Sequence, residues 1–286
     1  MILMALADSE ILARHLDDPD WVVFDCSHDL ADPGRGRADY LKSHIPGARF
    51  VHLDDDLSGP RNSNNGRHPL PDPSVLAEKL GRAGVDSGKQ VVTYDAQGGL
   101  FAARLWWLLR WLGHLPVAVL DGGWNQWTAE GRPQTADLPA PRAVQFSGQA
   151  DDSWVDAQFV LARLGQPGSV LLDARAPDRF RGENETLDPI GGRIPGARNR
   201  FFRDNLDAKG CFKPPQMLAA ELAAALGGAR PERSVHYCGS GVSAAHNLLA
   251  MEIAGLRGAR LYPGSWSEWC ADSSRPVAAG KPQPGE

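Results

Sequence analysis

A cysteine followed by a glycine-rich turn is the feature of this sequence most suited to chemistry. Residues 238–244 read C-G-S-G-V-S-A, directly after a predicted strand at 234–237 and directly before a helical pattern of apolar residues. Two glycines let successive backbone N–H groups turn inward around an anion, and the N-terminus of the following helix adds its positive dipole end. Because such a setting favours the thiolate, we predict that Cys238 is a nucleophile rather than a cysteine that only packs.

Three kinds of site could use this turn, and the neighbouring residues rank them. A dinucleotide site fits G-x-G-x-x-A at 239–244, but the next predicted strand, at 260–262, has no acidic residue for a ribose. A cysteine phosphatase needs an arginine six positions after its cysteine, and that position is Ala244. Sulfur transfer needs a thiolate and a ring of N–H donors for a persulfide anion, with no metal and no organic cofactor. This turn offers both, so sulfur transfer is the third possibility.

The elements that position this cysteine occur twice in the chain. Four segments of the first half return in order in the second half, namely VVFD and VLLD (22–25, 170–173), HIPGAR and RIPGAR (44–49, 193–198), VTYD and VHYC (92–95, 235–238), and DGGW and PGSW (121–124, 263–266). Short apolar runs alternate with helical patterns in both halves, which predicts an α/β fold with mainly parallel sheets flanked by helices. We expect an N-terminal domain at 1–138, a Pro-rich linker at 139–150 and a C-terminal domain at 151–286.

Length and composition agree with two ordinary globular domains. A chain of 286 residues corresponds to about two domains, and 42% hydrophobic with 23% charged residues excludes wholesale disorder. A net charge of −5 argues against a nucleic-acid partner, and no apolar run reaches the ~18 residues of a membrane span. The beginning of the sequence lacks the features of a signal peptide.

The four cysteines, at 26, 211, 238 and 270, form no C-x-x-C pair. This spacing argues against a disulfide framework and against a zinc site. We therefore expect a reduced, cytoplasmic protein in which Cys26, Cys211 and Cys270 are structural.

The two copies differ in length and in one functional position. Ile45 to Tyr94 spans 49 positions and Ile194 to Tyr237 spans 43, so the first copy carries six extra residues, which we place in the polar stretch 54–72. Such a loop is either an ordinary surface insertion or a segment that reaches the site of the other domain.

The duplicated halves, the paired I-P-G-A turns and the C-G-S-G-V-S-A loop together resemble the tandem rhodanese-domain sulfurtransferases. The resemblance extends from Leu6 to about Val277. It implies that only the second domain carries the nucleophile, in keeping with Asp95 at the matching position of the first copy. It also implies an active site in the cleft between the domains, and neither a metal nor a cofactor.

The loop sequence bears on the sulfur donor. Within this family, C-G-S-G-V-T-A is typical of the 3-mercaptopyruvate enzymes, whereas thiosulfate enzymes show C-R-K-G-V-T with two cations for the dianion. Ser243 replaces the threonine and keeps a hydroxyl. The resemblance thus implies transfer from 3-mercaptopyruvate to a thiol, cyanide or thioredoxin-like acceptor through a Cys238 persulfide. Thiosulfate:cyanide transfer by the same mechanism and a sulfur-carrier or binding module with weak turnover are the alternatives.

The resemblance also implies substrate-binding residues. Arg179 matches the arginine that holds the donor's carboxylate, for which a planar guanidinium is well shaped. The family's second arginine, nine residues further on, is Asp188 here, and Arg193 or Arg198 is the candidate replacement. The backbone of the loop is expected to bind the substrate at Gly239, Gly241, Val242 and Ser243.

A proton relay is the last element that the resemblance implies. Asp54, His68 and Ser240 match a family Asp-His-Ser relay, in which the carboxylate orients the imidazole and the imidazole acts on the hydroxyl. Asp54 and His68 both lie in the stretch that carries the insertion, so the relay and the reaching loop are compatible. For each of these residues the alternative is a solvated loop side chain.

Overall fold

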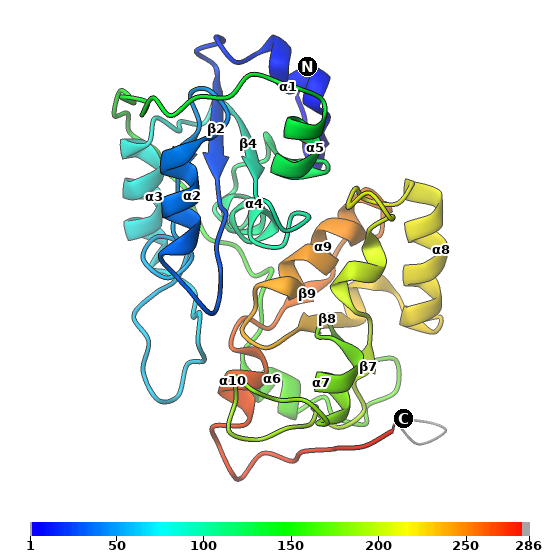
Figure 1. Cartoon of the computed structure of the whole chain (residues 1–286). Helices are drawn as coiled ribbons and strands as arrows, with labels where there is room; N and C mark the ends of the chain where they lie inside the picture. Colours follow the sequence, from blue (N-terminus) through cyan, green and yellow to red (C-terminus); the bar gives the residue numbers. More distant parts are fainter. Residues whose placement is uncertain (1, 282–286) are drawn as a thin grey trace. The chain divides into compact units, whose positions relative to one another are not determined.

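The computed structural model describes residues 2–281, and the chain divides into two compact units (Figure 1). The first unit holds the chain up to Gly59 together with Leu70–Asp151 and Asp207–Phe212. The second holds Pro60–Pro69, Asp152–Leu206 and the chain from Lys213 on. The expected boundaries put the linker 139–150 between two continuous domains. The structure instead counts that stretch with the first unit and exchanges two short segments between the units.

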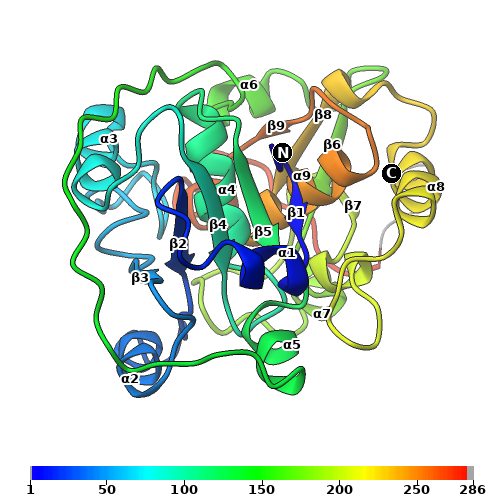
Figure 2. The same cartoon turned by 90° about the horizontal axis from the view of Figure 1, so that it is seen from above.

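A five-stranded sheet, parallel at every pairing, forms the centre of the first unit. Its order is β1-β5-β4-β2-β3, and Figure 2 shows β2, β4, β5 and β1 beside one another in that sequence. The strands are β1 (Leu6–Ala7), β2 (Trp21–Asp25), β3 (Arg49–Phe50), β4 (Gln90–Tyr94) and β5 (Val117–Leu120). Nearly every residue of β2, β4 and β5 is buried, as expected for a parallel sheet covered on both faces.

Helices cover both faces of this sheet. Leu12 and Trp127 pack with alternate strand residues such as Val92 in one buried cluster, so α1 and α5 cover one face. The helix α4 is buried nearly all round, and Thr93 of β4 donates its hydroxyl hydrogen bond to the Ala102 carbonyl at its start. The helices are α1 (Ser9–Arg14), α2 (Arg35–Lys42), α3 (Pro73–Arg82), α4 (Ala102–Trp111) and α5 (Gly123–Ala129).

The second unit repeats this plan. Its parallel sheet has the order β7-β6-β8-β9, and a parallel bridge from Trp154 to Leu261 extends it beyond β9, as β1 does beyond β5. The strands are β6 (Val170–Asp173), β7 (Arg198–Asn199), β8 (Ser234–Tyr237) and β9 (Arg260–Leu261). The duplication and the α/β fold predicted from the repeated motifs are therefore confirmed.

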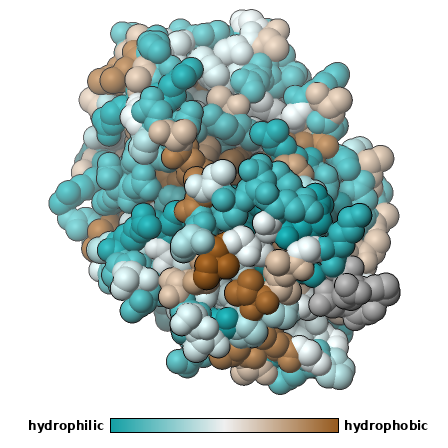
Figure 3. Space-filling view, turned by 60° about the horizontal axis from the view of Figure 1, so that its bottom comes forward, coloured by the Kyte–Doolittle hydropathy of each residue, from teal (hydrophilic) through white to brown (hydrophobic). Residues whose placement is uncertain are grey.

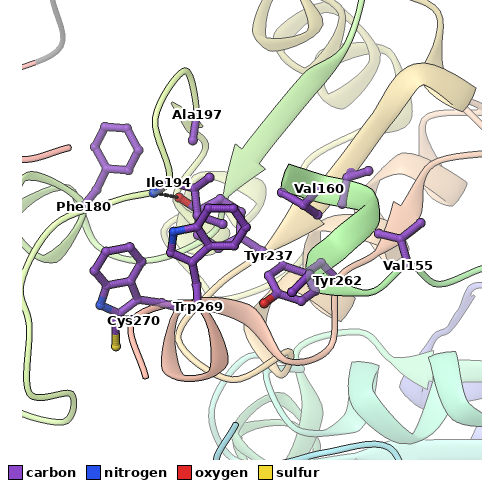
Figure 4. Close-up of a cluster of buried hydrophobic side chains, with 12 residues drawn as sticks. Val155, Val160, Phe180, Ile194, Ala197, Tyr237, Tyr262, Trp269 and Cys270 are labelled. Carbon is purple, nitrogen blue, oxygen red and sulfur yellow. Dashed lines mark hydrogen bonds between the residues drawn. The ribbon is translucent and has the colours of Figure 1, made fainter. Parts of the chain in front are cut away.

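The helices of the second unit match those of the first in order. They are α6 (Ala157–Leu161), α7 (Pro177–Arg181), α8 (Pro215–Leu226), α9 (Ser243–Ile253) and α10 (Ser265–Trp269), with short 3-10 turns η1 (Phe202–Asn205) and η2 (Pro231–Arg233). Figure 4 shows the core that α6 and α10 form with the sheet, including Val160, Tyr237, Tyr262 and Trp269.

One buried hydrogen bond ties two of the repeated motifs together in each unit. Tyr237 at the end of β8 accepts a hydrogen bond from the Ile194 N–H at 3.3 Å, drawn as a dashed line in Figure 4. In the first unit Tyr94 accepts from Ile45 N–H at 3.2 Å. The I-P-G-A turn is thus fixed against the strand that precedes the cysteine in one copy and the aspartate in the other.

No helix among residues 2–281 is both long and apolar enough to cross a membrane. The face drawn in Figure 3 is mostly hydrophilic, and its apolar side chains lie in small groups.

Candidate active site

The cysteine lies in the backbone cradle that its sequence predicts. Cys238 follows β8 directly and is 2% exposed. Its Sγ accepts hydrogen bonds from the N–H groups of Ser240 at 3.4 Å and Gly241 at 3.1 Å. Gly241 has φ +78°, and a Cβ there would lie 2.5 Å from the carbonyl oxygen of Pro263. A side chain at 241 would therefore break the turn that aims these N–H groups at the sulfur.

A second loop, at the start of α10, is hydrogen-bonded to this cradle through Ser265. Ser265 is the only non-glycine residue with positive φ (55°) among residues 2–281. Its hydroxyl accepts from the Cys238 N–H at 3.1 Å and donates to the Tyr262 carbonyl at 2.8 Å. The first copy has Gly123 with φ 54° at this position. Sequence reasoning missed Ser265, and the signal was its replacement of a glycine in the otherwise matching DGGW and PGSW motifs.

The first copy holds the same kind of cradle, filled by the chain itself. The carboxylate of Asp95 accepts hydrogen bonds at 2.7–2.9 Å from the N–H groups of Gln97, Gly99, Phe101 and Ala102. Burial raises the pKa of Asp95, whereas these four hydrogen bonds lower it. The cradle of the first copy thus contains a carboxyl group of the chain itself where the second copy has a thiol.

The polar loop of the first copy lies against this cysteine site. His68 Nδ1 is 2.7 Å from Ser240 Oγ, and both residues are 6% exposed. The Arg67 N–H donates to Ser267 Oγ at 3.0 Å, and a Cβ on Gly66 would lie 2.7 Å from the carbonyl oxygen of Gly264. Of the two expectations for this loop, the structure therefore supports the second, in which the loop reaches the cysteine site of the other copy.

Asp54, the third member of the expected relay, belongs to the first unit. Its Oδ2 is 4.0 Å from His28 Nε2 and 4.0 Å from His52 Nδ1. These three residues are a possible metal-binding group among residues 2–281, with ligand atoms within 4.8 Å of one another. Zinc ligands lie about 2 Å from the metal, so the group would have to contract around an ion. A relay role for Asp54 stays a prediction.

Two arginines lie beside the residue that follows the cysteine. A Cβ built on Gly239 would be 2.8 Å from Arg67 Nη2 and 3.5 Å from Arg179 Nη2. Arg179 binds Glu185 through Nε at 3.1 Å and Nη2 at 2.7 Å, while Arg67 Nη1 donates to Asp188 Oδ1. Arg67 was not predicted. Its position directly before His68, and an aspartate where a cation was expected at 188, were the available signals.

Arg193 and Arg198, the predicted replacements for the second arginine, are engaged elsewhere. Arg193 is 1% exposed, donates from Nη1 to the Gly280 carbonyl at 2.8 Å and lies over the Phe180 ring at 4.9 Å. Arg198 donates to the Ala225 carbonyl at 3.0 Å, near the end of α8. A substrate-binding role for Arg193 stays a prediction, and these contacts join its side chain to the C-terminal segment and to Phe180.

The remaining loop residues begin the helix after the cysteine. Val242 is the N-cap of α9 and is buried, and Ser243 is the first helical residue. Their predicted contacts with substrate remain predictions. The N-terminus of an 11-residue helix nevertheless adds its positive end to the cradle.

The other three cysteines lie in settings that favour the neutral thiol. Burial raises the pKa of Cys26 well above its ordinary value. Burial likewise raises the pKa of Cys211 to about 11, and that of Cys270 to about 11. None of the three shares the glycine turn of Cys238, so they remain structural residues in our interpretation.

The fold and the cysteine loop together define a rhodanese-type protein, and comparison with known families agrees. The model of the rhodanese-like domain matches the chain twice, at residues 8–130 and 156–272. The chain belongs to the rhodanese-like family and is a sulfurtransferase with two such domains.

Several relatives named as sulfurtransferases match most of the chain. It is 50% identical over 278 residues to a probable 3-mercaptopyruvate sulfurtransferase of Pseudomonas aeruginosa, covering 96% of this chain and 98% of that protein. It is 38% identical to the putative thiosulfate sulfurtransferase SseB of Mycobacterium tuberculosis, covering 90% of each. Among solved structures, the 3-mercaptopyruvate sulfotransferase SseA from Escherichia coli superposes with a TM-score of 0.80 at 30% identity, covering 93% of this chain and 100% of SseA.

Proposed function

We propose that this protein transfers sulfur from 3-mercaptopyruvate to a thiol or cyanide acceptor through a persulfide on Cys238. The observation that carries the proposal is the cradle around Cys238 Sγ, in which two backbone N–H groups face the sulfur and the adjoining side chains of 239 and 240 carry no charge. Arg67 and Arg179 supply positive charge beside the loop from other segments. A 50% identical relative is named for 3-mercaptopyruvate, which supports this donor.

In the proposed reaction, the Cys238 thiolate attacks the sulfur of the donor. A sulfur–sulfur bond forms and the carbon–sulfur bond breaks, and its electron pair stays on carbon as the enolate of pyruvate, which then takes a proton. The N–H groups of Ser240 and Gly241 stabilise the negative charge on sulfur without reorganisation. The Ser240 hydroxyl and His68 imidazole, 2.7 Å apart, are the proton-carrying groups of this step.

An acceptor nucleophile completes the cycle by attacking the outer sulfur of the persulfide. Cyanide leaves as thiocyanate, and a thiol leaves as a persulfide of its own. A thioredoxin-like protein acceptor and a cytoplasmic location are parts of the same proposal, because all four cysteines are free thiols, as in reducing compartments.

Intact-mass spectrometry tests the proposal directly. After exposure to 3-mercaptopyruvate, the protein should gain the mass of one sulfur atom and lose it again on addition of cyanide. Cys238→Ser should gain nothing and should turn over no substrate, while Cys211→Ser and Cys270→Ser serve as matched controls that still gain and lose the sulfur. A fully active Cys238→Ser variant would contradict the mechanism.

Thiosulfate is the alternative donor, favoured by the 38% identical relative named for it. The ratio of kcat/KM for 3-mercaptopyruvate to that for thiosulfate decides between the two donors. A persulfide that forms on Cys238 but is never discharged by any acceptor would instead indicate a sulfur carrier.

A further inference from the structure

A chain of alternating charges runs through the second unit and ends beside the cysteine loop. Each pair of neighbouring side chains in it forms an ion pair. The nitrogen–oxygen distance is 2.7 to 3.6 Å in four of these pairs, and Arg67 and Asp188 are in closer contact. In order along the chain of contacts, its members are Asp173, Arg175, Glu185, Arg179, Asp188 and Arg67. Three carboxylates alternate with three guanidinium groups, so the positive charges of the arginines are formally balanced.

Asp188 is the member that links the two arginines nearest to the cysteine. Its side chain is 3% exposed. Oδ1 accepts from Arg67 Nη1, and Oδ2 lies 3.6 Å from Arg179 Nη2. Within residues 2–281, Oδ2 is buried without a hydrogen-bond partner. Burying a carboxylate oxygen without a hydrogen bond lowers the stability of the folded protein. A contribution to stability alone therefore does not explain a carboxylate at position 188.

Both arginines lie beside the residue that follows the nucleophile, where we expect the donor to bind. Arg67 Nη2 and Arg179 Nη2 lie 2.8 and 3.5 Å from the position of a Cβ on Gly239, the residue after the nucleophile. Arg67 and Arg179 are 16% and 21% exposed, so both guanidinium groups keep contact with solvent. A side chain at 239 would displace the Arg67 guanidinium group, and the cations of this site come from outside the loop.

We propose that Asp188 sets the charge of the donor that this site accepts, because it holds Arg67 and Arg179 together beside Gly239 while its own negative charge lowers the positive potential there. The inference rests on the proposed function. The negative charge of Asp188 therefore disfavours a dianion such as thiosulfate more strongly than a carboxylate monoanion. Arg67 is accordingly a second donor-binding residue, and Asp188 is a specificity-determining residue.

The test uses three sulfur donors of different charge on the full-length protein at one pH and one ionic strength. They are the methyl ester of 3-mercaptopyruvate, which is neutral, 3-mercaptopyruvate itself and the thiosulfate dianion. The measured quantity is the second-order rate constant for persulfide formation on Cys238, followed by rapid quenching and intact mass. Asp188→Asn keeps the shape and an acceptor for Arg67 but removes the charge.

Because Coulomb energy scales with the charge of the donor, the effect of Asp188→Asn should scale in the same way. The rate constant should stay unchanged for the ester, rise on the order of threefold for 3-mercaptopyruvate and rise on the order of tenfold for thiosulfate. Arg67→Gln should give the mirror image, with no change for the ester and the largest loss for thiosulfate. Glu183→Gln, which removes a charge paired with Arg181 at the surface, is the matched control and should affect no donor.

A change by one common factor for all three donors would assign Asp188 a structural role and overturn the inference. No change with any donor would overturn it as well. Failure of the proposed function looks different, because the wild-type protein would then form no persulfide on Cys238 with any of the three donors.

Discussion

His68 Nδ1 lies 2.7 Å from Ser240 Oγ, although 172 positions separate the two residues in the chain. The segment that carries His68 is counted with the second unit, and both side chains are buried. Ser240 also donates its backbone N–H to Cys238 Sγ at 3.4 Å. The hydroxyl that His68 contacts therefore belongs to the same residue that helps to form the cradle around the nucleophile.

His68→Gln and Ser240→Ala should each slow the formation of the Cys238 persulfide by about tenfold to a hundredfold, because general acid–base groups contribute in that range. If the two side chains act as one unit, the double variant should be no slower than the slower single variant. Rapid-quench mass spectrometry measures the rates, and Ser63→Ala, an exposed residue of the same loop, is the control. Rates that multiply in the double variant would show that the two residues act independently.

Two substitutions of Ser265 separate the effect of its positive φ from the effect of its hydroxyl group. Ser265→Gly keeps the φ of 55° at no cost but removes the hydroxyl that accepts from the Cys238 N–H, so kcat should fall by about threefold to tenfold while the thermal midpoint changes little. Ser265→Ala loses the same hydrogen bond and keeps the strain, so it should be less stable than Ser265→Gly by about 1 kcal/mol. Thermal unfolding of the two variants measures this difference, and equal stabilities would contradict the role of backbone strain.

Asp95→Ala should destabilise the first unit without changing the surroundings of Cys238. Its carboxylate accepts from four backbone N–H groups, which the substitution would leave buried without an acceptor. The cost should be about 2–4 kcal/mol in the free energy of unfolding, measured by urea denaturation. Asp95→Asn keeps one oxygen and should cost less. An Asp95→Ala variant as stable as the wild type would show that the cradle does not depend on its internal anion.

The fold could be predicted from the sequence because its evidence is local and occurs twice. Each copy carries the same turn, strand and loop motifs in the same order, and the two sheets accordingly share one strand order. The turn around Cys238 could be predicted for the same reason, since the N–H groups that face its sulfur belong to Ser240 and Gly241, although the support from Ser265 was missed.

Apart from Arg179, the charged part of the site was not predicted, because its contacts join distant positions. Arg67 pairs with Asp188 across 121 positions, and no local pattern around either residue indicates this pairing. The contacts of the Arg193 side chain could not be predicted for the same reason. Its residue type and its motif are right for an anion site, but tertiary packing directs its side chain to Gly280 and Phe180.

His236 leads to a prediction for acidic pH. It lies on β8 two residues before the nucleophile, it is fully buried, and burial lowers its pKa from 6.5 to about 3. Neither of its ring nitrogens has a hydrogen-bond partner within residues 2–281. Between about pH 3 and 6.5 the unfolded chain therefore binds a proton that the folded chain does not, so this residue lowers the free energy of unfolding as the pH falls.

His236→Leu should remove this contribution. The wild-type free energy of unfolding should fall below pH 6.5 more steeply than that of the variant, with a difference in slope of up to about 1.4 kcal/mol per pH unit. Above that pH the imidazole is neutral in both states, so the difference between the two proteins should be constant, which provides an internal control. Urea denaturation from about pH 4.5 to 7.5 measures both curves. Parallel curves over the whole range would mean that His236 takes up its proton in the folded protein, and that its buried surroundings admit the charge that they are expected to exclude.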